Sequence, residues 1–146
     1  MKILSIPNEN GKMTCFWEEG ASSGKKPLII CLADKEEDAQ RDLNLLFSQA
    51  NGASVAALVV YPQTEEQIVG DWLYSLRQRE DVDENRITLT GTLSAADWVW
   101  RLGSHFPQWF AGICAVGGYG DPYEVRAMKN VPVRAYLVEE EPQIIR

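Results

Sequence analysis

Short uninterrupted runs of apolar residues recur along the chain, separated by polar stretches. They occupy residues 27–32, 54–61, 87–90, 110–116 and 133–138. A run of this length between turn formers is typical of a strand that is buried on both faces, as in a parallel sheet. The pattern therefore predicts five buried strands.

Amphipathic stretches lie between these runs and predict helices. Residues 35–50 carry apolar side chains at helical spacing, and Asp34 is placed to cap that helix. A second helix is expected to begin at a capping box in residues 64–67, and a third spans residues 94–105. A short helix is also expected over residues 122–129, where a proline suits the first turn.

The N-terminal part has a different pattern. Residues 2–6 and 13–18 are apolar runs separated by turn formers, which predicts a hairpin, and residues 19–26 read as a polar loop. Strands that alternate with helices imply a mostly parallel sheet with helices on both faces. The predicted class is α/β: a three-layer αβα sandwich with an N-terminal antiparallel hairpin, in one domain over residues 1–146.

Composition and charge limit the partners and the cellular location that we expect for this chain. The net charge of −7 disfavours nucleic acid and anionic membranes as partners, and it suits solubility or a basic protein partner. Cys15, Cys31 and Cys114 lie inside strand-like runs without disulfide or metal spacing, so we expect buried thiols. With no long apolar run and no leader pattern, we expect a cytoplasmic protein that needs no cofactor and no metal.

One stretch, residues 86–96 (RITLTGTLSAA), reads as a buried strand, a sharp turn and the start of a helix. Together with residues 61–63, 82–91, 105–111 and 131–136, it resembles the α/β-hydrolase superfamily. The most similar group is the small esterases akin to polyhydroxybutyrate depolymerases, carboxylesterases and dienelactone hydrolases. The resemblance runs from about residue 27 to residue 142 and implies a shortened α/β-hydrolase-like fold.

The resemblance also shows where this chain departs from an esterase. Such enzymes carry the nucleophilic serine two residues after the glycine of a sharp turn, the nucleophile elbow. Counting from Gly91 places Leu93 there, with Ser94 next, and a leucine cannot attack a carbonyl. The small residues Gly91, Ala95 and Ala96 keep the compactness that such a turn needs.

The other catalytic positions differ as well. The loop that helps to form the oxyanion hole holds Ala33 and Asp34, and a carboxylate there would repel an oxyanion. The acid position falls at Glu141. The family's histidine follows the last strand, whereas the one histidine here, His105, lies 11 residues past Ser94, roughly 16 Å along a helix.

These residues leave more than one function open. We expect a catalytically degenerate α/β-hydrolase-like protein with a binding, inhibitory or scaffolding role, in which Ser94 caps the third helix. The alternative is a serine esterase that uses Ser94, Glu141 as acid and a base from elsewhere. A flavodoxin-like nucleotide-binding domain fits the alternation of strands and helices, but not the residue patterns of the stretches that resemble the hydrolases.

A partner contact is expected at the C-terminal edge strand. The chain ends soon after its last predicted strand, and Ile144 and Ile145 add apolar surface there. Because an open strand edge can pair with another strand, we expect either a homodimer or a protein partner at this edge.

Overall fold

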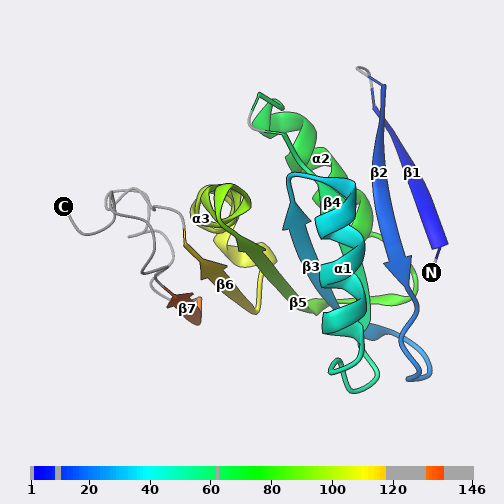
Figure 1. The fold of residues 1–146 in the computed structure, drawn as a ribbon. Coiled ribbons are helices and arrows are strands. Elements are labelled where there is room, and N and C mark those ends of the chain that lie inside the picture. The colour runs from blue at the N-terminus through cyan, green and yellow to red at the C-terminus, as the bar shows by residue number, and fades with distance from the viewer. Residues whose placement is uncertain (1, 9–10, 62, 118–130, 137–146) are drawn as a thin grey trace.

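The computed structural model describes residues 2–8, 11–61, 63–117 and 131–136. Within them, seven strands form one sheet in the order β1-β2-β4-β3-β5-β6-β7 (Figure 1). The strands are β1 (Lys2–Asn8), β2 (Gly11–Glu18), β3 (Lys26–Ala33), β4 (Ser54–Val59), β5 (Val82–Thr92), β6 (Gly112–Val116) and β7 (Val133–Tyr136). The helices described are α1 (Glu36–Phe47), α2 (Glu66–Arg77) and α3 (Ser94–His105), followed by the 3-10 turn η1 (Pro107–Trp109).

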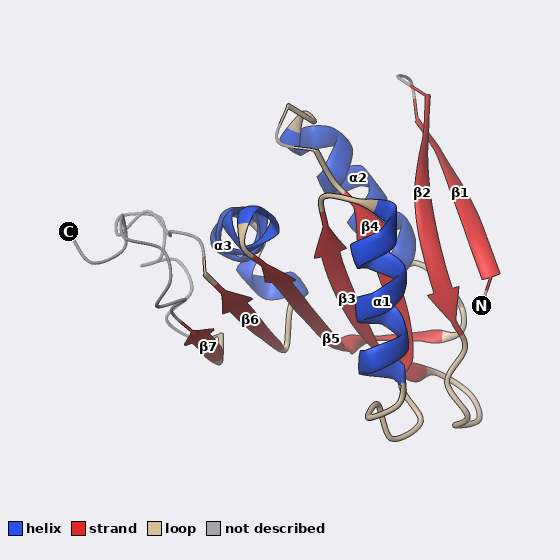
Figure 2. Ribbon diagram, in the orientation of Figure 1, coloured by secondary structure: helices blue, strands red, loops and turns tan. Residues whose placement is uncertain are grey.

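The sheet confirms the predicted fold class. The hairpin β1–β2 is antiparallel, and β2 also pairs antiparallel with β4. From β4 onward through β3, β5, β6 and β7, every neighbouring pair is parallel. Helix α1 lies on one face of the sheet, and α2 and α3 lie on the other (Figure 2).

The two faces have separate cores because successive side chains of a strand point to opposite sides. On the α1 face, Ala39 and Leu43 pack against Cys31 and other small strand residues. On the other face, α2 and α3 bury a larger cluster that includes Trp98. Cys15 is buried in that cluster, and burial raises the pKa of the thiols of Cys15 and Cys31 to about 12.

The local helix-start signals were less accurate than the periodicity. The capping box in residues 64–67 is wrong, because α2 begins at Glu66 and its N-cap residue, Glu65, makes no side-chain capping bond. Asp34 does not cap α1 either, since the N-cap residue is Lys35. The expected helix over residues 122–129 lies outside the described residues.

The segment predicted as a polar loop contains a charged network at its end. Lys26 belongs to β3 and is only 8% exposed, and its ammonium group pairs with the carboxylate of Glu19. The other oxygen of Glu19 accepts a hydrogen bond of 2.9 Å from the indole N–H of Trp17. Arg79 stacks on the Trp17 ring, 4.5 Å from its centroid, and forms a two-pronged ion pair with Asp81. These contacts fasten β2 and β3 to the turn before β5.

We predict that this network makes the fold sensitive to acid. Hydrogen bonds from Lys26 and Trp17 hold the pKa of Glu19 below its ordinary value of 4.5. The stabilisation is therefore complete above pH 4.5 and is lost as the pH falls through the lower, folded-state pKa. In urea unfolding at pH 7, Glu19→Gln should lower the free energy of unfolding by about 1 kcal/mol, because it leaves Lys26 without its charged acceptor.

The control is Asp83→Asn, which breaks an exposed ion pair with Arg86 and should change stability little. The difference between wild type and Glu19→Gln should shrink toward pH 3, and a difference independent of pH would contradict the assignment.

Candidate functional site

The turn between β5 and α3 has an unusual backbone conformation at one residue. Leu93 has φ 54° and ψ −122°, a positive φ that residues with a Cβ rarely adopt. Its N–H donates a hydrogen bond of 2.7 Å to the carbonyl of Val116 at the end of β6. The chain thus reverses within one residue from strand to helix, and the Leu93 side chain at the tip is 50% exposed.

Small residues allow this reversal. A Cβ added at Gly91 would lie 2.9 Å from a methyl carbon of Val99 and 3.0 Å from the carbonyl oxygen of Ala95. Ala95 and Ala96 are buried in the first turn of α3, directly behind the strand. The helix can therefore return against β5 only because Gly91 has no side chain, as the sequence pattern predicted.

The side chain at the tip decides what the turn can do. In a sharp strand-to-helix turn, the strained residue is the one that presents its side chain above the sheet. Here that residue is Leu93, the same position that counting from Gly91 gives. A leucine has no lone pair and no proton to exchange, so the presented side chain offers a contact surface and no nucleophile.

Ser94 has a different role from the predicted cap. It is the first residue of α3, its neighbour Leu93 is the N-cap residue, and no side chain caps this helix. The hydroxyl of Ser94 instead donates to Oδ2 of Asp34 over 2.9 Å. This long-range contact exists because β3 and β5 are adjacent and parallel, so the residues that follow their carboxyl ends meet. The α3 dipole also favours a carboxylate at this end.

The structure brings together most of the residues that the sequence singled out. Leu32 pairs with Gly91 in the sheet, so the segment with Ala33 and Asp34 lies beside the segment with Leu93 and Ser94. Glu141 lies outside the described residues.

His105 is the last residue of α3 and is exposed. Its Nδ1 lies 2.8 Å from a carboxylate oxygen of Glu66, a contact that fastens the end of α3 to the start of α2. Sequence reasoning missed Tyr61 as a surface feature. This residue follows β4 and is 50% exposed, and nothing in an apolar strand sequence distinguishes its last, exposed residue from its buried ones.

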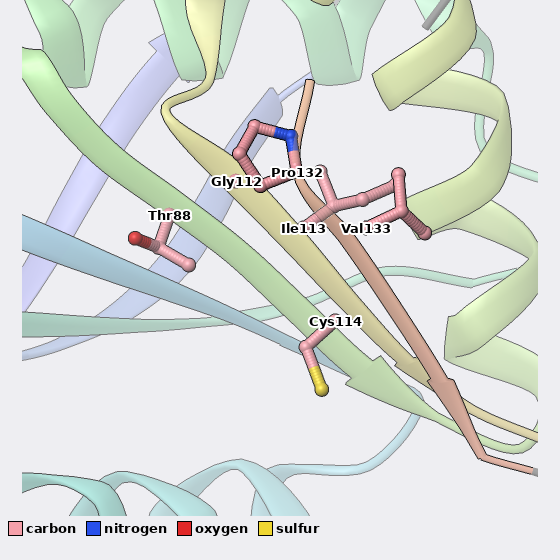
Figure 3. A pocket seen from close by; sticks show the side chains of 6 residues that line it. All are labelled: Thr88, Gly112, Ile113, Cys114, Pro132 and Val133. Carbon is pink, nitrogen blue, oxygen red and sulfur yellow. The ribbon is translucent and has the colours of Figure 1, made fainter. Parts of the chain in front are cut away.

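A hollow of about 490 Å³ lies elsewhere on the sheet (Figure 3). Its lining comes from β5, β6 and the start of β7: Thr88, Gly112, Ile113, Cys114, Pro132 and Val133. Thr88 precedes Leu93 by five residues, which is roughly 16 Å along a strand. The hollow therefore does not belong to the turn, and its lining is uncharged.

The described part of the chain has neither a cluster of metal ligands nor a helix that could span a membrane. No group of three or more His, Cys, Asp or Glu side chains there could hold a metal ion. No helix there is long and apolar enough to cross a membrane, the three α-helices having 12 residues each.

The sheet order, the helix placement and the strained turn together define an α/β-hydrolase-like fold. A thermostable esterase matches with a TM-score of 0.79 and 17% identity over 97% of this chain and 47% of that chain. A putative dienelactone hydrolase from Klebsiella pneumoniae matches with a TM-score of 0.64 and 15% identity, covering 95% of this chain and 85% of its own. Est1E from Butyrivibrio proteoclasticus matches with a TM-score of 0.63 and 11% identity, covering 78% of this chain and 50% of its own.

These matches confirm the fold that the resemblance implied, and at such identities they show the fold alone. The chain spans about half the length of the thermostable esterase. Neither a family model nor a curated protein matches the chain by sequence.

We predict that the strain at the turn can be measured. Leu93→Ala keeps a Cβ at positive φ, whereas Leu93→Gly removes it, so the glycine variant should be the more stable of the two by about 1 kcal/mol in thermal or urea unfolding. As a control, the same pair of substitutions at Leu45, an exposed residue of α1, should show the opposite order, because glycine is the worse helix former. If alanine were also the better residue at position 93, the strained conformation would be ruled out.

Proposed function

We propose that this chain is a catalytically degenerate α/β-hydrolase-like protein with a binding, inhibitory or scaffolding role. The observation that carries the proposal is Leu93, which occupies the strained tip of the turn with φ 54°. Acyl transfer in this fold needs a nucleophile at that tip, and a hydrocarbon side chain supplies none.

The charge beside the turn supports the same proposal. The carboxylate of Asp34 lies 2.9 Å from the Ser94 hydroxyl, next to the first turn of α3. An ester carbonyl oxygen gains negative charge in the transition state and needs hydrogen-bond donors around it. A carboxylate in that place raises the barrier by repulsion, and it also disfavours anionic ligands.

A second candidate function, a serine esterase that uses Ser94, is favoured by that same hydrogen bond. Asp34 is positioned to take the hydroxyl proton as Oγ forms a bond to the ester carbonyl carbon. The proton would then pass to the departing alkoxide, which leaves as the alcohol while the acyl group stays on Ser94. In this version Asp34 is the base that the sequence did not supply, with Glu141 as a further acid. His105 is too far along α3 to take part within one chain.

The proposal also covers the cellular location of the protein and its partner. We propose a cytoplasmic protein, an inference supported by three free thiols, two of them buried, among the described residues. We also propose a homodimer or a protein partner at the C-terminal edge, where β7 is the outermost described strand. An open edge strand offers unpaired backbone groups to another chain.

The two candidate functions predict different results with a short-chain nitrophenyl ester. We expect the wild-type protein to release nitrophenol no faster than the Ser94→Ala and Asp34→Asn variants do. The matched control is Ser75→Ala, which removes another exposed hydroxyl whose hydrogen bond stays within α2. Turnover by the wild type and Ser75→Ala that is lost in Ser94→Ala would establish the esterase and reject the degenerate protein.

The homodimer makes a separate prediction. Light scattering coupled to size-exclusion chromatography should give twice the chain mass of 16.4 kDa at high protein concentration, with the monomer gaining on dilution. Val133→Lys, at the exposed start of β7, should shift the equilibrium toward monomer. A monomer at every concentration would leave only the heterologous partner.

A further inference from the structure

We propose that the residues around the turn form a docking surface for a basic polypeptide segment that carries an apolar side chain. This proposal rests on the binding role proposed above and names its surface and its partner. We call it the elbow surface and define it by six residues: Asp34, Glu36, Glu37, Tyr61, Leu93 and Asp97.

Three neighbouring strands bring this surface together. Tyr61 follows β4, Asp34 follows β3 and Leu93 follows β5, and these strands are adjacent in the order β4-β3-β5. The N–H of Val60 donates to the carbonyl of Ala33 over 2.8 Å, which holds the first two strand ends together. The bond between Ser94 and Asp34 holds the second and third together. Asp34, Tyr61 and Leu93 therefore lie at the carboxyl ends of adjacent strands, and Glu36, Glu37 and Asp97 lie in the first turns of the helices that follow β3 and β5.

Two large apolar side chains lie exposed on this surface. Leu93 and Tyr61 are each 50% exposed, although both follow strands whose interiors are buried. The backbone of Leu93 is also held in place by its bond to Val116, so binding would not have to order the backbone there. Preorganised apolar residues of this kind are suited to anchor a partner's side chain.

Carboxylates flank these apolar residues. The first turn of α1 has three acidic residues, Glu36, Glu37 and Asp38, and the first turn of α3 has Asp97. With Asp34 that makes five carboxylates; Lys35 lies among them, and Arg41 pairs with Asp38 over 3.3 Å. The chain as a whole is also negatively charged, with a net charge of −7. Charge complementarity therefore selects a basic partner and repels nucleic acid.

The spacing of the surface selects a polypeptide over a small cation. From β4 to β5 is two interstrand spacings, about 10 Å in all. A ligand that contacts both Tyr61 and Leu93 and also pairs with acids on two helices must span that distance with charges on either side. An extended peptide does so in about three to four residues, at roughly 3.3 Å for each residue.

The test is a titration of the isotope-labelled full chain, followed by amide NMR, with a synthetic six-residue peptide of alternating lysine and leucine. The largest shifts should fall on the amides of Asp34, Tyr61 and Leu93, and a peptide with glutamate in place of lysine should give none. Affinity should fall steeply with added salt. Shifts that centre elsewhere, or equal shifts with the glutamate peptide, would overturn the proposal.

Two double variants with the same change of charge separate the surface from general attraction. Glu36→Lys with Glu37→Lys should weaken binding about tenfold more than Glu80→Lys with Glu84→Lys, which alters exposed acids at and near the other end of β5. Equal weakening by both would also overturn the proposal. Leu93→Ala should weaken binding at unchanged charge, and circular dichroism checks that each variant is folded.

Failure of this docking proposal is distinct from failure of the proposed function. Ester turnover that depends on Ser94 would reject the degenerate protein whether or not the peptide binds. Absence of both turnover and peptide binding would reject the elbow surface alone.

Discussion

The backbone reversal at Leu93 is the constraint on which the centre of this molecule depends. Strand β5 is buried at Gly91, one residue before its end, and α3 has to turn back at once to cover the sheet. That geometry forces a positive φ on one residue and removes the space for any side chain at Gly91. The bond from Leu93 to Val116 then sets where β6 lies relative to the turn. Strain of about 1 to 3 kcal/mol is tolerated because the buried strand and helix on either side determine the path.

In an esterase of this fold, such a reversal presents a nucleophile, and here it presents a hydrocarbon. The positive φ is therefore present at a residue whose side chain is not a nucleophile. Asp34 lies in the neighbouring loop, and its carboxylate accepts a hydrogen bond from the Ser94 hydroxyl. We interpret this hydrogen bond as a structural contact that holds the segment after β3 to the segment after β5. Under the function proposed above, this end of the sheet, with Leu93 and Tyr61 exposed and carboxylates beside them, would serve recognition.

Periodicity was enough to predict the layers, because burial on two faces or on one stripe is a property of each segment alone. It gave the bounds of α3 correctly, since Gly91 and the alanines after it mark the turn. The resemblance, by counting from Gly91, pointed to Leu93, which is the residue with the positive φ. The length of β5 was underestimated, because its polar first half is recruited by pairing between Val82 and Lys26, which no local pattern contains.

Contacts between distant segments account for the errors at single side chains. Ser94 resembles a helix cap by its type and position, but its hydroxyl is taken by a carboxylate 60 residues away. Lys26 resembles a loop residue until Glu19 and Trp17 give its charge a partner. Tyr61 is the last residue of an apolar run, and its exposure depends on where the sheet ends. Each of these follows from the assembled sheet rather than from the neighbouring sequence.

The central claim is that the turn presents no competent nucleophile. The most direct measurement is the intact mass of the protein after prolonged incubation with a fluorophosphonate probe, which bonds to activated serines. We expect the mass to remain that of the unmodified chain under conditions that label a serine esterase completely. A single adduct that maps to Ser94 and is absent from Ser94→Ala would contradict the claim.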